Sequence, residues 1–448
     1  MILDGALEAF GADPSRLAVA DDSGAWTWTG LMAEVGQTAS ELGPSPVGEP
    51  VEIRVPSSRE FLTRFLAAAR LRRPACTLHT DWSGPELEAA TSATRSFRPA
   101  VPPAEDNDPF FYIGFTSGTS GRPKPFARRS MSWISSFEPA GKMFSIEAGD
   151  VVYLPGSLQH SHFLFGAVLG LNLGATVRMF ERFDAAKLAE ELREVSRGIV
   201  YLVPTMLFTL DELGLEPLTG VHSLVISGSK MEPHHWDIAH RLFPGATASE
   251  IYGASELSFV TVNSGEAEQP DPGFVGPPFS GVEIEIRSNG DGPGLVFVRS
   301  PYLFDGYFDE SGSRSPIGPD GFMTVGDVGV LSEEGLSIVG RASNMLITGG
   351  KNVHPEEVES RLAEHESVSE CVVVGLPDDR WGEEIVAFLV ASNPGDLPDA
   401  GELRDHLKDL VASYKVPKRW FTVEQIPRTR AGKTDRSRDR LLELATEI

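Results

Sequence analysis

The sequence predicts an α/β protein with a large, multi-lobed N-terminal domain and a small, mobile α+β C-terminal domain. Two observations carry this expectation. Short apolar runs alternate with helical stretches up to about residue 300, and a second set of helices and strands begins near residue 340. Alternating strands and helices are typical of a mainly parallel sheet. A chain of 448 residues also exceeds the size at which one hydrophobic core stops growing.

In the first domain, short apolar runs predict buried strands, and the stretches between them have helical character. The runs are Val151–Leu154, Thr176–Phe180, Ile199–Val203 and Ser223–Ser227, with helical stretches such as Ala185–Val195 and Pro204–Leu213 between them. After Gly273, short β segments are divided by Gly, Pro and Asp, which predicts a small β-rich lobe.

The last hundred residues or so have their own pattern of helices and strands, typical of a compact domain. The expected elements are helix Pro355–Ala363, strands Cys371–Gly375 and Ile385–Ala391, and helix Ala400–Leu410. We therefore expect one domain over residues 1–341 and a second over residues 342–448.

The composition narrows the classes of partner. Sixty-four acidic and 39 basic residues give a net charge of −25, which disfavours binding to nucleic acid or to an anionic membrane. The two cysteines, Cys76 and Cys371, lack metal-ligand spacing and are expected to be buried and reduced. The N-terminus lacks a basic region and no apolar run has membrane-spanning length, so we expect a cytoplasmic protein.

A segment rich in glycine and hydroxyl groups follows the apolar run Phe110–Phe115. It contains Thr116, Ser117, Gly118, Thr119, Ser120 and Gly121, and it closes with Pro123 and Lys124. Closely spaced N–H groups and hydroxyls can surround phosphate oxygens, and Lys124 adds a cation. The segment does not fit a Walker A loop. On the residues alone, a plain strand-to-helix connector is the alternative.

This segment resembles the phosphate loop of the adenylate-forming (AMP-binding) superfamily, which includes acyl-CoA synthetases, adenylation domains and luciferases. Further motifs follow in the family's order and extend the resemblance over roughly residues 20–440. They are Tyr252–Glu256 (YGASE), Gly326–Asp327, Gly340–Arg341, Ile347–Glu359 (ITGGKNVHPEEVE) and Pro427–Arg436 (PRTRAGKTDR).

The resemblance implies an ATP-dependent ligase that joins an acid to AMP, releases pyrophosphate, and passes the acyl group to a thiol of CoA or a carrier protein. The loop would hold the phosphates of ATP. Glu256 would hold Mg²⁺, which prefers carboxylate and phosphate oxygens, and Ser255 would lie beside the α-phosphate. Lys433 would bridge the acid and the α-phosphate in the transition state. The nucleotide site would be completed by Tyr252, Gly253, Asp327 and Arg341, with Asp327 on the ribose hydroxyls.

The resemblance also implies an acid pocket and a moving C-terminal domain. The pocket would be formed by His160, Phe163, Ser227 and Gly228, together with Tyr252 and Gly253. These small and aromatic residues favour an aryl or short acyl acid. After rotation about Ser343, where relatives have Asp or Lys, Gly349 and Gly350 would leave space for a pantetheine arm. For His160 and His162, a metal site and a buried hydrogen-bonded pair are alternatives.

Two other functions stay open at this stage. The first is an amide synthetase, which would transfer the activated acid from its adenylate to an amine. The acid activated in this case could also be an unusual small oxyacid. A nucleotide-binding module that has lost catalysis is the third reading. The expected partner is a small-molecule acid, and a carrier protein and a homodimer are left open.

Overall fold

The computed structural model describes residues 2–43, 49–97, 108–117, 123–265, 273–288, 292–309, 312–348, 351–378, 380–393, 399–428 and 434–447. The chain divides into two compact units, each built from several segments. The first comprises Met1–Glu266, Pro278–Glu283 and Val298–Met323, and the second comprises Ala267–Pro277, Ile284–Phe297 and Thr324–Ile448. The domain boundary expected after residue 341 stays a prediction.

The first unit contains an eight-stranded sheet in which β11, β10, β9, β7, β8 and β1 run parallel, and an antiparallel hairpin closes each end. The four expected strands are β7 to β10. In sheet order the strands are β12 (Ser258–Asn263), β11 (Thr247–Ala254), β10 (Val221–Ile226), β9 (Gly198–Leu202), β7 (Val151–Leu154), β8 (Thr176–Met179), β1 (Leu17–Asp21) and β2 (Gly24–Thr27).

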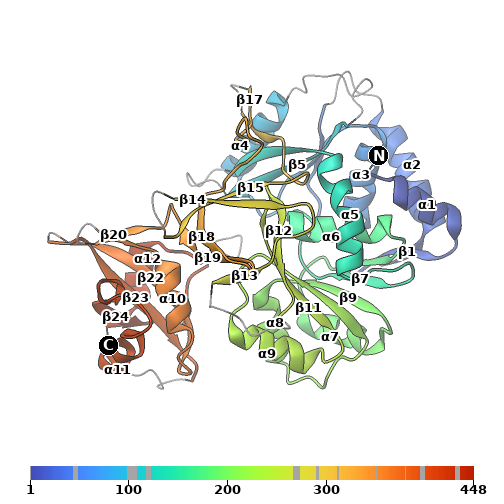
Figure 1. The fold of residues 1–448 in the computed structure, drawn as a ribbon. Coiled ribbons are helices and arrows are strands. Elements are labelled where there is room, and N and C mark those ends of the chain that lie inside the picture. Colours follow the sequence, from blue (N-terminus) through green and yellow to red (C-terminus); the bar gives the residue numbers. More distant parts are fainter. Residues whose placement is uncertain are drawn as a thin grey trace. The chain divides into compact units, whose positions relative to one another are not determined.

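Helices cover this sheet because each presents an apolar stripe to it. In α7 (Ala185–Glu194) the buried residues are Ala185, Leu188, Ala189 and Leu192, the spacing of one helical face. The side chain of Asp184 caps the start of this helix by accepting a hydrogen bond from Lys187 N. Together with α8 (Pro204–Asp211) and α9 (Pro233–Leu242), it lies along the sheet near β9 and β11 (Figure 1). A further helix, α6 (Ser161–Asn172), is buried from Phe163 to Leu171, so nearly its whole circumference lies in the core.

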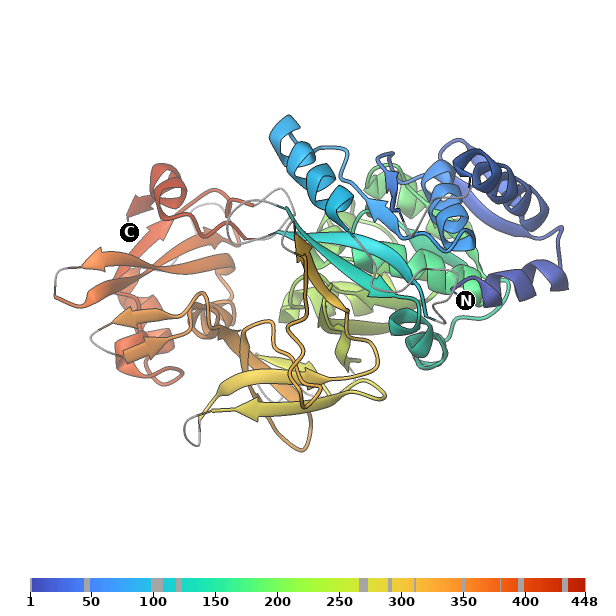
Figure 2. The ribbon, with the colours of Figure 1, turned by 90° about the horizontal axis from the view of Figure 1, so that it is seen from above.

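The second sheet of this unit carries the predicted phosphate loop. Its order is β17 (Gly312–Arg314), β16 (Gly306–Asp309), β6 (Pro123–Arg129), β5 (Phe110–Ser117), β4 (Ala75–Thr77) and β3 (Val51–Ile53). Strands β3, β4 and β5 are parallel, whereas β6 runs antiparallel to both β5 and β16. Helix α4 (Gly84–Ser96) lies beside β6 in both ribbon views (Figures 1 and 2).

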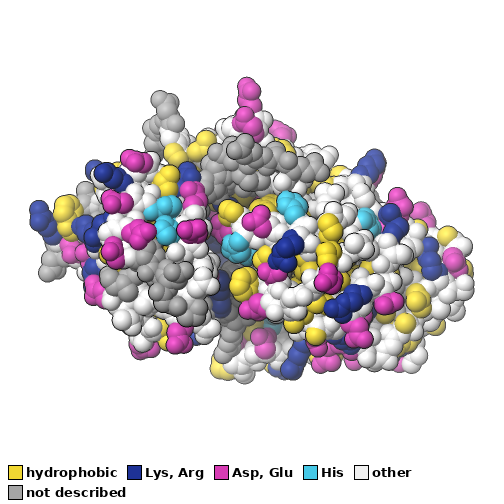
Figure 3. Space-filling view, turned by 90° about the horizontal axis from the view of Figure 1, so that it is seen from below, with side chains coloured by type: hydrophobic (Ala, Val, Ile, Leu, Met, Phe, Trp, Pro, Cys, Tyr) yellow, Lys and Arg dark blue, Asp and Glu magenta, His cyan; other side chains and the backbone are white. Residues whose placement is uncertain are grey.

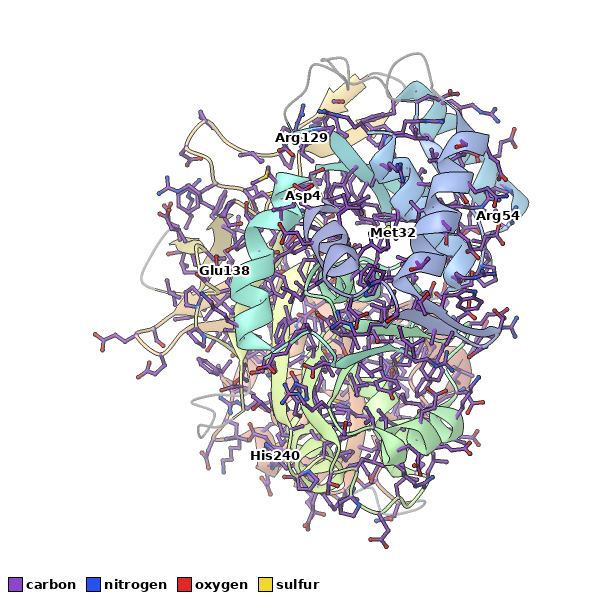
Figure 4. All side chains as sticks on the ribbon, turned by 90° about the vertical axis from the view of Figure 1, so that its right-hand side faces the viewer. Asp4, Met32, Arg54, Arg129, Glu138 and His240 are labelled. Atoms are coloured by element: carbon purple, nitrogen blue, oxygen red, sulfur yellow. The ribbon has the colours of Figure 1, made fainter. Side chains whose placement is uncertain are left out.

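The other helices of the first unit are α1 (Asp4–Ala12), α2 (Trp28–Leu42), α3 (Arg59–Arg70) and α5 (Met131–Met143). Figure 4 shows Arg129 at the end of β6, from which the chain passes into α5, the helix that carries Glu138.

The second unit has two sheets of its own. The first is the expected β-rich lobe, in the order β13 (Phe274–Gly276), β19 (Leu336–Arg341), β18 (Asp327–Leu331), β15 (Gly294–Arg299) and β14 (Glu283–Arg287). The second has the order β21 (Lys351–Val353), β20 (Leu346–Thr348), β23 (Gly382–Ala391), β24 (Arg419–Thr422) and β25 (Thr446–Glu447), with β22 (Val368–Asp378) also paired to β23. Its helices are α10 (Pro355–Leu362), α11 (Ala400–Leu407) and α12 (Arg438–Leu444).

Alternation along β23 explains how the second sheet builds a core on each face. Ile385, Ala387 and Leu389 belong to one buried cluster, and Val386 and Phe388 belong to another. Successive side chains of a strand point to opposite faces, so this apolar run is buried on both sides of the sheet.

Acidic and basic side chains are interspersed over the face shown in Figure 3. Among the described residues, no helix combines the length and the apolar character needed to cross a membrane. Neither cysteine forms a disulfide. Cys76 is buried as expected, and burial raises the pKa of its thiol to about 12, but Cys371 is only partly buried.

Candidate active site

An antiparallel hairpin brackets the predicted phosphate loop. Strands β5 and β6 pair so that Thr116 lies opposite Lys124 at the end of the hairpin. The chain therefore passes from strand to strand, and the strand-to-helix connector considered as an alternative is wrong. The side chain of Ser117 and the residues Gly118, Thr119, Ser120 and Gly121 lie outside the described residues. Phosphate binding by this loop stays a prediction.

A tyrosine that sequence analysis missed joins two of the predicted site residues. Tyr307 lies on β16, and the pairing of β16 with β6 brings it to the hairpin. The Nζ atom of Lys124 lies 3.3 Å from the centroid of the Tyr307 ring. The Tyr307 hydroxyl donates a hydrogen bond to Oε1 of Glu256 at 2.6 Å. Residues predicted to bind phosphate and magnesium are therefore held by one side chain.

Glu256 and Ser255 lie in the turn that links β11 to β12. No helix begins there. A β-bulge interrupts the pairing between Tyr252 and Gly253. A Cβ atom at Gly253 would lie 1.9 Å from the carbonyl oxygen of Ser258, so only glycine fits at this point.

A buried arginine holds this turn against β6. Arg128 is 1% exposed and donates from Nε and Nη2 to the carbonyl oxygen of Ser255, at 3.1 and 2.7 Å. Its Nη1 donates to the carbonyl oxygen of Tyr302 at 2.8 Å and to Ser132 Oγ at 3.1 Å. Burial lowers the pKa of Arg128 to about 10, so it stays charged at neutral pH. From α6, Ser161 Oγ lies 3.0 Å from Ser255 Oγ and orients that hydroxyl.

Aromatic side chains gather beside the hairpin. The His160 ring lies 4.9 Å from the His79 ring, the His79 ring lies 4.8 Å from Trp82, and Trp82 meets the edge of Phe115 on β5 at 5.0 Å. Burial lowers the pKa of His79, so its ring is neutral at physiological pH. His160 is thereby brought into a cluster of rings next to the predicted phosphate loop.

The neighbouring histidine has a structural role. Burial lowers the pKa of His162 to about 4, and its Nε2 atom bonds to the carbonyl oxygen of Leu202 at 3.1 Å. For His162, the structure therefore agrees with the alternative of a buried, hydrogen-bonded histidine. The described residues include no group of three His, Cys, Asp or Glu side chains that could hold a metal ion, so the histidine metal site finds no support there.

The remaining acid-pocket residues lie on two adjacent strand ends and one core helix. Ser227 and Gly228 follow β10, next to the end of β11 that carries Tyr252, and Ser227 Oγ donates to the carbonyl oxygen of Ile251 at 3.0 Å. The carboxyl ends of neighbouring parallel strands are where ligands bind in open α/β sheets. Phe163 is buried on α6, and its contact with an acid stays a prediction.

Sequence analysis also missed a buried acid beneath the loop that follows β10. Glu250 on β11 is 2% exposed, and its Oε1 accepts a hydrogen bond from Met231 N at 2.6 Å. Its Oε2 accepts one from Asn263 Nδ2 at 3.3 Å. Burial raises the pKa of Glu250 to about 7, although the Met231 bond and the nearby ammonium of Lys230 oppose that rise. The loop after β10 is thus tied to β11.

In the second unit, two predicted nucleotide-binding residues form an ion pair. Asp327 begins β18 and lies opposite Arg341 at the end of β19, with Arg341 Nε 2.7 Å from Asp327 Oδ1. The predicted hinge residue follows in a turn. The Ser343 hydroxyl bonds to Asn344 Oδ1 at 3.3 Å, and Asn344 Nδ2 donates to Glu356 Oε1 on α10 at 2.6 Å. Gly349 and Gly350 lie outside the described residues.

The predicted catalytic lysine, Lys433, also lies outside the described residues, but the chain on either side of it is anchored. Arg428 and Thr434 form an isolated β-bridge. Arg436 then makes a two-pronged ion pair with Glu359 of α10, with distances of 2.6 and 2.7 Å. These contacts hold Arg428, Thr434 and Arg436 in place within the second unit.

The donor groups in the first unit fit a complex of magnesium with a nucleotide. Mg²⁺ in such sites takes one or two carboxylates, with phosphate and water oxygens completing its shell. Glu256 supplies a carboxylate that is 8% exposed and oriented by Tyr307. The Lys124 ammonium supplies the opposite charge that phosphates need.

Comparisons with known proteins agree with this arrangement. The family model described as AMP-binding enzyme matches residues 89–308, and the AMP-binding enzyme C-terminal domain matches residues 357–433. The chain is 36% identical, over 465 residues and 95% of each protein, to YhfT, an uncharacterized acyl-CoA ligase of Bacillus subtilis (strain 168).

Two solved structures share the fold over nearly the whole chain. The o-succinylbenzoate CoA synthetase MenE of Bacillus subtilis, in complex with its acyl-adenylate intermediate, has a TM-score of 0.82 at 23% identity and 98% coverage of both chains. The amide bond synthetase McbA of Marinactinospora thermotolerans has a TM-score of 0.85 at 24% identity, covering 99% of this chain and 100% of its own. The expected fold class is confirmed, and the chain belongs to the AMP-binding enzyme family as an ATP-dependent adenylate-forming ligase.

Proposed function

We propose that this ligase activates a small carboxylic acid, aryl or short acyl, and transfers it to the thiol of CoA or of a carrier protein. The observation that carries the proposal is that Tyr307 contacts both predicted site residues, with Lys124 over its ring and Glu256 at its hydroxyl. It offers a cation for phosphate and a carboxylate for magnesium within one small region. The thiol acceptor is supported by the similarity to YhfT, an acyl-CoA ligase that aligns over 95% of this chain.

In the first half-reaction, a carboxylate oxygen of the acid attacks the α-phosphorus of ATP. A carbon–oxygen–phosphorus linkage forms, the bond between the α- and β-phosphates breaks, and pyrophosphate leaves. Lys124 and the hydroxyl of Thr116 bind the departing phosphates, and Ser255 donates its hydroxyl to the α-phosphate. Lys433 bridges the attacking carboxylate and the α-phosphate. Magnesium held by the Glu256 carboxylate would neutralise charge on the phosphates.

In the second half-reaction, the thiol sulfur attacks the acyl carbon, the carbon–oxygen bond to AMP breaks, and AMP leaves. The C-terminal domain rotates about Ser343 so that Gly349 and Gly350 replace Lys433 near the adenylate. Asp327 binds the ribose hydroxyls of the nucleotide, and Arg341 contacts the ribose or a phosphate. Their ion pair supports this role because it already holds the Asp327 carboxylate in a fixed direction.

The acid is proposed to be uncharged apart from its reacting carboxylate. The side chains next to the hairpin are the rings of His79, Trp82, Phe115 and His160. Since burial lowers the pKa of His79, that ring offers no positive charge to a second anionic group. Flat aromatic surfaces stack on an aryl acid and make few contacts with a branched polar one.

Acid-dependent exchange of pyrophosphate into ATP isolates the first half-reaction and tests the proposal. The acid panel contains aryl, short acyl and long acyl acids, together with small inorganic oxyacids. We expect exchange with an aryl or short acyl acid, and we expect Lys433→Ala to reduce it by on the order of 10²-fold or more. Lys142→Ala serves as the matched control, because Lys142 is an exposed lysine that pairs with Glu138 on α5.

The acceptor is identified by adding CoA or simple amines and following AMP release over many turnovers. Stimulation by CoA supports the thiol ligase, whereas stimulation by amines alone makes the enzyme an amide synthetase. If no acid gives exchange, or if Lys433→Ala equals wild type, the proposed chemistry is wrong and the non-catalytic nucleotide-binding module takes its place.

A further inference from the structure

We infer that Tyr307 is a positioning residue that sets the Glu256 carboxylate for magnesium and keeps the Lys124 ammonium available for phosphate. This inference rests on the proposed function, because it assigns both neighbours their roles there. It adds a residue that no motif in the sequence indicated.

The chain segment that carries Tyr307 holds Glu256 at two points. The Tyr307 hydroxyl donates to the Glu256 carboxylate at 2.6 Å, and Phe304 N donates to the Glu256 carbonyl oxygen at 2.9 Å. The Tyr307 ring packs edge to face against the ring of Phe304, with centroids 4.9 Å apart. Backbone and side chain of Glu256 are therefore fixed by one segment.

The hydrogen bond decides which way the carboxylate faces. An ionised carboxylate has two oxygens and about four lone-pair sites, and Tyr307 occupies one site on Oε1. A glutamate without this bond would sample several rotamers, and ordering it would weaken metal binding. Because a neutral donor leaves the carboxylate its full negative charge, the bond orients Glu256 without neutralising it.

The face of the same ring holds the cation. Lys124 is exposed and has a flexible stem, yet its Nζ atom lies 3.3 Å from the ring centroid, within the range of a cation–π contact. One side chain thus contacts an ammonium through its ring face and a carboxylate through its hydroxyl, two groups of opposite charge that attract each other. A direct ion pair would consume both charges, whereas the tyrosine keeps each one directed toward its ligand.

Two substitutions separate the two contacts. Tyr307→Phe removes the hydrogen bond to Glu256 and keeps the ring beneath Lys124, whereas Tyr307→Leu removes both. The matched control is Tyr302→Phe. Tyr302 lies in the same segment, is more deeply buried than Tyr307, and donates its hydroxyl to the carbonyl oxygen of Ser280 at 2.5 Å, away from Glu256.

Equilibrium binding of α,β-methylene-ATP, measured by calorimetry with magnesium and again with EDTA, gives a readout independent of turnover. For Tyr307→Phe we expect the dissociation constant with magnesium to rise roughly tenfold, from loss of a hydrogen bond to a charged group. The constant in EDTA should stay at the wild-type value. Tyr307→Leu should weaken binding in both conditions, and Tyr302→Phe in neither.

A double-mutant cycle with Glu256→Gln excludes a general structural effect. If Tyr307 acts through Glu256, then Tyr307→Phe adds no further loss of magnesium-dependent binding in the Glu256→Gln background. Equal losses with magnesium and EDTA for Tyr307→Phe, or full additivity in the cycle, would overturn the inference. Absence of nucleotide binding and acid-dependent exchange in the wild-type enzyme would instead overturn the proposed function.

Discussion

Replacing Glu250 with glutamine should remove a pH-dependent part of the protein's stability. Burial raises the pKa of this carboxyl from an ordinary 4.5 to about 7. Between these two values the folded chain holds the proton and the unfolded chain does not, so the free energy of unfolding falls as pH rises. The stabilisation is complete below pH 4.5 and is lost as pH passes 7. At about 1.4 kcal/mol per pH unit, the difference between 4.5 and about 7 amounts to ~3 kcal/mol.

Urea unfolding of wild type and Glu250→Gln at pH 5 and pH 8, followed by tryptophan fluorescence, measures this quantity. The wild type should lose up to ~3 kcal/mol relative to the variant between the two pH values, because only the wild type must ionise a buried acid. Glu138→Gln, at an exposed glutamate of α5, should show no such change. If the difference between wild type and Glu250→Gln is the same at both pH values, Glu250 titrates normally and the reasoning from burial is wrong.

Two further substitutions test packing and pairing through the melting temperature and urea unfolding. Gly114→Ala would bring a methyl group to 2.4 Å from the buried Phe126 ring and should cost ~1–3 kcal/mol, whereas Gly36→Ala in α2 meets no atom closer than 3.8 Å and should stabilise. Equal effects of the two would contradict the packing around β5. Arg436→Met leaves the largely buried carboxylate of Glu359 without its ion-pair partner and should lower the free energy of unfolding by about 3 kcal/mol. Arg419→Met breaks an exposed ion pair with Glu447 and should cost less than about 1 kcal/mol. A small loss for Arg436→Met would mean that this ion pair does not anchor the segment before it.

The sequence predicted those parts of the fold whose signal is local. Apolar runs between helical stretches identified β7 to β10, because a strand buried on both faces needs a continuous apolar segment. Motifs likewise singled out the predicted phosphate loop and Glu256, although the hairpin and the turn that carry them were not predicted. What local pattern cannot give is which distant segments meet. Tyr307 reaches the hairpin only through the pairing of β16 with β6.

The burial of two charged residues, Arg128 and Glu250, was not predicted for a related reason. Arg128 stands next to Arg129 in the sequence, and a pair of basic residues is typical of a solvated surface. Arg128 is nevertheless buried, because carbonyl oxygens of Ser255 and Tyr302, both remote in sequence, accept its hydrogen bonds. Glu250 lies in an otherwise ordinary strand, and its burial depends on a loop from the neighbouring strand and on Asn263.

The acidic composition and the binding of a polyanion are compatible because charge acts over short distances. At physiological salt, exposed charges farther apart than about 8 Å are largely screened, so a net charge of −25 spread over the surface contributes little at the site. The positive charges of Lys124 and the buried Arg128 are not screened from the site in this way, because both side chains lie close to the turn that carries Glu256. A nucleic acid, by contrast, places phosphates along an extended surface and would meet the interspersed carboxylates shown in Figure 3. The same charge distribution therefore admits a small anion at one site and disfavours a long one over the face shown in Figure 3.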